Sequence, residues 1–123
     1  MSTDASTVDT IIMERGIVAV LCQLPRQDAT RIELLRLLPT YRWHSSDCRV
    51  IYEALATWPA EASEIHAALP ARITRLGFPD TEIDFCFEVS VLSPVAALGS
   101  LRAELQRQRT SDALHSESSH QTR

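Results

Sequence analysis

His44 and Cys48 are the side chains whose types and spacing come closest to a reactive site, because they lie four residues apart with Asp47 between them. Imidazole, thiolate and carboxylate groups bind transition metals, and a thiolate beside an imidazole can act as a nucleophile. A zinc site draws on close pairs of ligands, and the chain has no Cys-x-x-Cys pair to complete a set. We therefore expect Cys48 to pack in the core and His44 to lie in a loop before a helix, and we predict no metal site.

Other catalytic patterns are missing from the sequence. It has no Gly-x-Ser-x-Gly elbow, and its three glycines, Gly16, Gly77 and Gly99, cannot be written into either common phosphate-binding loop. Asp84 and Glu88 lie at helical spacing, but paired acids on a polar helix face usually serve solvation. We predict no catalytic residue, no cofactor-binding residue and no cofactor, so the chain is not expected to be an enzyme.

The three cysteines indicate a reducing compartment. Cys22, Cys48 and Cys86 are odd in number, widely spaced and set among apolar residues, which is typical of buried free thiols. The N-terminus carries acids where a secretory signal carries basic residues, and the longest apolar run, 16–22, is too short to span a membrane. We expect a cytoplasmic protein with no membrane contact.

The charge pattern argues against nucleic acid as the main ligand. The formal net charge is −4, and the twelve basic residues are all arginines. A phosphate-binding surface with Tyr41 and Trp43 as stacking groups is the alternative, and its arginines would be Arg42, Arg49, Arg72, Arg75, Arg102, Arg107 and Arg109. Acids are interleaved with these arginines, so we favour a solvated helical surface, with the aromatic residues in the core.

The apolar spacing predicts helices in the N-terminal half. A stripe from Met13 to Leu24 forms a first helix that ends at Pro25, and Gly16 within it favours close approach of a neighbour. Asp28 should cap a second helix over 29–38, whose wide apolar arc predicts a central place. Ser45 should cap a third helix, which ends near residue 58 because Pro59 follows.

The C-terminal half is less regular. Residues 60–69 predict a fourth helix that Pro70 interrupts and 71–76 resumes, with Gly77 as a left-handed terminator. Apolar residues occupy every second position of 83–91, as in a half-buried strand, but the segment also fits a helix. We favour the helix because no partner strand is evident. Ser93-Pro94 predicts the start of a final helix that runs to about Arg109.

These elements predict an all-α fold. We expect a compact orthogonal bundle of about six helices formed by a single domain over 8–109. The polar residues 1–7 should be frayed, and residues 110–123 should form a disordered tail.

Two segments carry a resemblance to a known family. Residues 14–22 read Glu-Arg-Gly-Ile-Val-Ala-Val-Leu-Cys, and 41–58 read as an aromatic loop followed by a capped amphipathic helix. Together they resemble the N-terminal helical domain of DnaB-type replicative helicases, in which a Glu-x-Ala-Val-Leu-Gly-Ala-Leu-Leu-like helix precedes a Phe-Tyr-x-x-x-His-Arg-Leu-Ile-Phe-Glu-Ala-like one. The C-terminal domain of bacterial primase has a related fold that docks on the helicase. The resemblance covers the first three helices well and the last one loosely.

The resemblance implies a protein-protein interaction module without catalysis, associated with DNA replication. A replicative helicase or primase is the implied protein partner, self-association is left open, and no interface residue can be assigned. Two alternatives from other classes stay open: a small helical nucleic-acid-binding regulator, and a small enzyme that uses Cys48 or His44.

Overall fold

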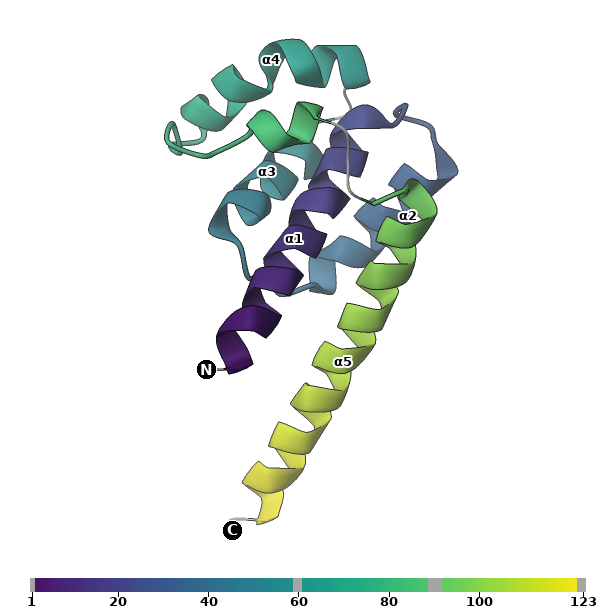
Figure 1. Ribbon diagram of the computed structural model, residues 1–123, viewed down its shortest axis with the longest axis vertical. Coiled ribbons are helices and arrows are strands. Elements are labelled where there is room, and N and C mark those ends of the chain that lie inside the picture. The colour runs from purple at the N-terminus through teal and green to yellow at the C-terminus, as the bar shows by residue number, and fades with distance from the viewer. Residues whose placement is uncertain (1, 59–60, 89–91, 122–123) are drawn as a thin grey trace.

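The computed structural model describes residues 2–58, 61–88 and 92–121, and no strand occurs in these ranges (Figure 1). Five α-helices and two short 3₁₀ helices make up the described chain. In order they are α1 Ser2–Gln23, α2 Ala29–Leu37, η1 Leu38–Thr40, α3 Ser46–Ala56, α4 Ala62–Arg75, η2 Asp84–Phe87 and α5 Pro94–Gln121. The predicted all-α class is confirmed, with five α-helices described where about six were expected.

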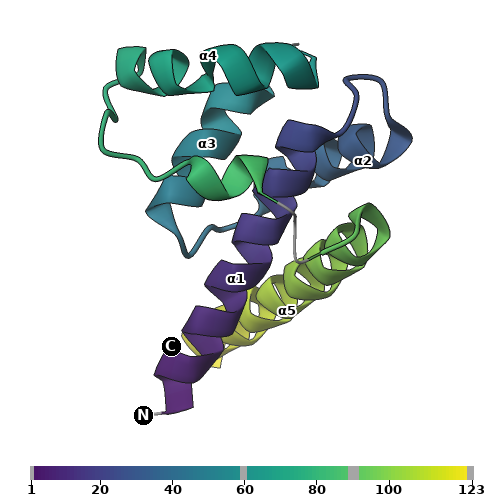
Figure 2. The ribbon, with the colours of Figure 1, turned by 45° about the horizontal axis from the view of Figure 1, so that its top comes forward.

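The central element is α1, which contacts each of the other α-helices and η2. Every residue from Ile17 to Cys22 is at most 4% exposed, so this part of α1 is covered on all sides. α4 packs across α1 and α3 at the end of the molecule remote from the N-terminus (Figure 2). The sequence-based expectation that the second helix would be central is wrong, because only Arg31 and Leu34 are fully buried on α2.

Local capping explains where three helices begin. The Asp28 carboxylate accepts hydrogen bonds from the Thr30 and Arg31 amides at 2.8 and 3.3 Å, which starts α2. Ser45 Oγ accepts from the Cys48 amide at 3.2 Å and starts α3, and Ser93 Oγ accepts from the Ala96 amide at 3.1 Å at the start of α5. Each cap satisfies an amide that has no partner within its helix, as predicted from the sequence.

Pro70 does not interrupt α4, which is continuous from Ala62 to Arg75. Proline removes one hydrogen bond, but Ile65, Leu69 and Ile73 recur on one face of α4 and are all buried in the core. Burial of that face outweighs the local cost, so the predicted interruption is wrong. The predicted start at residue 60 lies outside the described residues.

The structure describes residues 83–88 of the ambiguous segment 83–91, and four of these are helical. Residues 84–87 form a single 3₁₀ helix, and Cys86 is the residue that it buries fully. Residues 89–91 lie outside the described part of the chain. The helical interpretation is confirmed for η2, although the helix is one short turn.

Both terminal helices are longer than predicted. α1 begins at Ser2 and α5 continues to Gln121, past the expected end at Arg109, so its last turns extend beyond the other helices (Figure 1). No glycine or proline follows Gly99, so nothing in the sequence breaks the helix. Side-chain contacts at Gln108 and Asp112 also hold α5 to the loop before α3.

Gly16 provides a test of the packing of α1. A Cβ added at Gly16 would lie 2.8 Å from Cδ1 and 2.9 Å from Cγ of Leu92, closer than carbon atoms pack. We expect Gly16→Ala to lower the free energy of unfolding by about 1 kcal/mol through overpacking. In a Leu92→Gly background the same change should raise it by about 1 kcal/mol, because all three Leu92 carbon atoms near the added Cβ, including its Cβ at 3.3 Å, are then absent and the helix propensity of alanine decides the sign. Urea unfolding of the four proteins measures both values, and the same sign in both backgrounds would contradict the argument.

Candidate functional site

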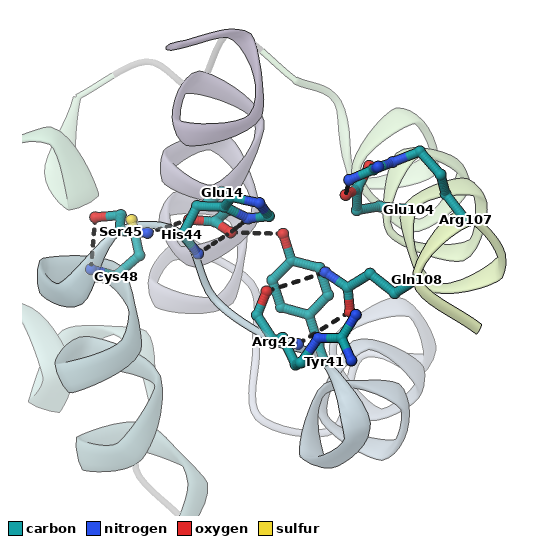
Figure 3. Close-up of polar contacts among 9 residues, drawn as sticks. All are labelled: Glu14, Tyr41, Arg42, His44, Ser45, Cys48, Glu104, Arg107 and Gln108. Atoms are coloured by element: carbon teal, nitrogen blue, oxygen red, sulfur yellow. Dashed lines mark hydrogen bonds and ion pairs between the residues drawn. The ribbon is translucent and has the colours of Figure 1, made fainter. Parts of the chain in front are cut away.

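Glu14 is the centre of a polar cluster that joins α1 to the segment before α3 (Figure 3). Its side chain on α1 is fully buried, yet the carboxylate accepts hydrogen bonds from the His44 and Ser45 amides, each at 2.8 Å. The Tyr41 hydroxyl donates to it at 2.5 Å, and the Nδ1 atom of His44 lies 3.3 Å away. The cluster therefore joins α1 to the loop that precedes α3.

This cluster positions α3. A buried carboxylate is costly unless hydrogen bonds replace its lost hydration, and here two amides and a phenol do so. Because Glu14 binds the Ser45 amide, it fixes the residue whose hydroxyl caps α3. The role that the geometry supports for Glu14 is structural.

Tyr41 extends the cluster into an aromatic row. Burial, together with the hydrogen bond to Glu14, raises the pKa of Tyr41, so the phenol stays protonated. Its ring packs edge-on against Trp43 at 5.0 Å, and Trp43 lies 5.5 Å from Tyr52. Trp43 and Tyr52 are partly buried against the core, as predicted for these aromatic residues.

The structure places His44 in the loop and Cys48 in the core, as the sequence predicted. Burial raises the pKa of the Cys48 thiol to about 11, which is the opposite of what a nucleophile requires. Within the described ranges, no three His, Cys, Asp or Glu side chains are grouped so that they could hold a metal ion.

Cys22 and Cys86 are also buried free thiols. A hydrogen bond between them, followed by burial, raises the pKa of Cys86. The Gln23 amide donates to the Cys86 and Glu88 carbonyls at 2.9 and 2.7 Å and so holds η2 against α1. The three cysteines therefore serve as packing groups in the described structure.

A polar pocket of about 270 Å³ adjoins the Glu14 cluster, and its lining residues are Arg42, Trp43, His44, Arg107, Gln108 and Ser111. Gln108 is 6% exposed. Its side-chain carbonyl accepts a hydrogen bond from the backbone amide of Arg42 at 3.1 Å, and its side-chain NH₂ group donates one to the backbone carbonyl of Arg42 at 3.0 Å (Figure 3). Arg42 forms an ion pair with Asp112, and Arg107 forms one with Glu104. The two cations of this pocket are therefore already balanced by acids.

Glu14 and Gln108 were not identified from the sequence. Glu14 lies three and four residues before Ile17 and Val18, so it shares the buried face of α1, and an isolated acid on such a face is the available signal. Gln108 follows Leu101 and Leu105 on the buried stripe of α5 by the same spacing. Each partner lies far away in the sequence, which the pattern does not reveal.

An apolar pocket of about 440 Å³ lies between α3 and the turn after α4, and its lining residues are Val50, Tyr52, Glu53, Ala56, Thr57, Leu76 and Phe78. Leu76 and Phe78 are 48% and 42% exposed. Gly77 between them has a φ of +100°, and the Phe78 amide donates to the Ile73 carbonyl at 3.2 Å. This helix-terminating motif fixes both apolar side chains relative to α4.

No protein-family model matches the chain, and neither the search of curated proteins nor the search of solved structures finds a significant match. The 22 residues of α1 and the 28 of α5 make these the longest described helices, but neither they nor the other described helices contain an apolar run that could cross a bilayer.

Removing the Glu14 carboxylate should destabilise the fold strongly. Glu14→Ala leaves the part-buried amides of His44 and Ser45 and the buried Tyr41 hydroxyl without their acceptor, so we expect a loss of about 3 kcal/mol in the free energy of unfolding. Tyr41→Phe removes one donor and should cost about 1 kcal/mol. Glu53→Ala, at an exposed ion pair with Arg49, is the matched control and should leave urea unfolding unchanged. Equal effects of Glu14→Ala and Glu53→Ala would contradict this role.

Cys48 should make stability sensitive to alkaline pH. A free thiol ionises near pH 9.0, whereas the pKa of Cys48 in the folded protein is about 11, so folding favours the protonated form. This contribution is complete below pH 9.0 and is lost as the pH rises to about 11. We expect the free energy of unfolding to fall less steeply over this range in Cys48→Ala than in the wild type. Parallel urea titrations at several pH values measure the difference, and identical slopes would refute it.

Proposed function

We propose that the chain is a non-catalytic protein-interaction module, and that it binds its partner through the apolar pocket of Tyr52, Ala56, Leu76 and Phe78. The observation that carries the proposal is the pair Leu76 and Phe78, which are about half exposed at the rim of an apolar pocket of about 440 Å³. Exposed apolar side chains at a concave site mark interaction surfaces. The helix-terminating motif at Gly77 holds them in place, which reduces the entropy lost on binding.

The proposed occupant is an apolar face of a helix in the replicative helicase or the primase. The resemblance to the helicase N-terminal domain rests on residues 14–22 and 41–58, and these two segments contact one another through Glu14, His44 and Ser45. The contact supports the resemblance because the matched segments then form one structural unit. Free, buried thiols fit the cytoplasm, where such a partner would be met.

The observed ion pairs favour a protein ligand over nucleic acid. Arg42, Arg49 and Arg107, three of the arginines considered for phosphate binding, pair with Asp112, Glu53 and Glu104. Phosphate binding would require these pairs to open, whereas an apolar helix needs no such change.

The experiment is a pull-down of the purified host helicase and primase by the tagged chain. We expect Phe78→Ser to weaken retention of the bound partner by roughly tenfold, because the only aromatic side chain at this exposed apolar pair is lost. Ile32→Ser is the matched control: Ile32 is 53% exposed on α2 and does not line the pocket, so this variant should bind like the wild type. Circular dichroism checks that both variants are folded. Failure of the wild type to retain either protein, or equal losses in both variants, would overturn the proposal.

A further inference from the structure

A third pocket, of about 340 Å³, lies between α2 and the C-terminal end of α3. Its walls are largely apolar and come from Leu35, Leu55, Ala56 and Trp58. Arg26, Arg31 and Thr57 supply the polar part of the lining. An apolar body with a few convergent polar groups is the usual composition of a small-ligand site.

Arg31 sets the chemistry of this pocket. Its side chain on α2 is only 2% exposed, and burial lowers its pKa, so the guanidinium sits where a positive charge is costly. Glu61 is the carboxylate that opposes this effect most, and the same carboxylate also accepts from the Arg26 amide at 3.1 Å. Arg26 Nε also lies 3.6 Å from Glu61 Oε1, so Glu61 pairs with Arg26.

A third arginine adds to the positive charge. The guanidinium of Arg72 lies 5.0 Å from the ring centre of Trp58 and donates to the Ala54 carbonyl at 2.9 Å and to Thr57 Oγ1 at 3.1 Å. Arg26 and Arg31 line the pocket itself, whereas Arg72 contacts Trp58 in its wall without lining the pocket. The pocket is locally cationic although the chain carries a net charge of −4.

We propose that this pocket binds a carboxylate attached to an apolar body, with the carboxylate at Arg26 and Arg31 and the body against Leu55 and Trp58. Guanidinium groups match the planar carboxylate in a two-bonded geometry, and the apolar walls suit an aliphatic or aromatic body better than a bare inorganic anion. A volume of about 340 Å³ accommodates a ligand of amino-acid size. The carboxylate can belong to a free organic acid or to the C-terminal residue of a peptide, since both present the same group.

This site is distinct from the docking surface in the proposed function. Leu76 and Phe78 line only the apolar pocket, whereas Arg26 and Arg31 line only the cationic one. Ala56 and Thr57 border both, so the pockets are neighbours at the end of α3. Failure of the helicase and primase to bind would therefore leave the carboxylate site untouched.

The test is an NMR titration of the ¹⁵N-labelled chain, followed at the indole N–H of Trp58, which a Trp43→Phe variant assigns. The probes are 3-phenylpropionate, its neutral amide, a short peptide ending in a free leucine carboxylate, and the same peptide amidated. We expect both acids to cause saturable chemical-shift changes at the Trp58 indole. Each neutral amide should bind at least tenfold more weakly than its acid, roughly the effect of losing a buried charge contact. Binding of the free acid alone identifies a small-molecule site, and tighter binding of the peptide acid identifies a chain terminus as the source.

Substitutions separate binding from folding. Arg31 is buried and its loss endangers the fold, so Arg26→Gln is the test variant, and it should weaken acid binding by roughly fivefold or more. Glu61→Gln keeps the hydrogen-bonding groups at the start of α4 but removes the competing charge, so it should strengthen binding, an effect that a merely structural residue would not have. Arg36→Gln, which loses an exposed pair with Glu33 on the same helix, is the matched control and should bind like the wild type. Equal shifts with acid and amide, no shift at millimolar acid, or equal losses in Arg26→Gln and Arg36→Gln would overturn the proposal.

Discussion

The buried carboxylate of Glu14 is the interaction on which the arrangement of the helices depends. It receives the amides of His44 and Ser45 and the hydroxyl of Tyr41, so a single group on α1 fixes the whole loop before α3. That loop in turn binds the Gln108 side chain of α5 through the backbone N–H and C=O groups of Arg42. Three helices that are distant in the sequence are thereby held by one continuous set of polar contacts, within a molecule whose other contacts are mainly apolar.

Such a cluster fixes the relative position of the helices more than it adds to the free energy of unfolding. Hydrogen bonds inside a protein replace those made to water, so their net gain is small, but leaving any member unpaired is expensive. An alternative packing of α3 on α1 would bury the Glu14 charge without donors. The cost of that alternative selects one arrangement, and the apolar contacts of Ile17, Leu21 and Ile51 then stabilise it.

Features that depend on neighbouring residues were predicted correctly from the sequence, whereas features that depend on tertiary contacts were not. The caps at Asp28, Ser45 and Ser93 depend on residues two or three positions apart, and all three are present. Continuity of α4 through Pro70 depends on burial of its apolar face, and the pairing of Gln108 with Arg42 joins residues 66 apart. Neither can be read from a window of neighbouring residues. The pockets were missed for the same reason, since Arg26 of one loop and Trp58 of another meet only after α1, α2 and α3 have packed.

The end of α3 is where this scaffold meets its proposed ligands. Ala56 and Thr57 border both pockets, and Arg72 of α4 reaches back to the Ala54 carbonyl and to Thr57, so it ties α4 to that end of α3. Arg72 also lies 5.0 Å from the ring centre of Trp58, which lines the cationic pocket, and α4 is followed by Leu76 and Phe78, which line the apolar one. The two pockets therefore share the C-terminal end of α3 as a common wall. If a ligand in one pocket changes the affinity of the other pocket for its ligand, thermodynamic linkage requires the reverse effect to have the same factor.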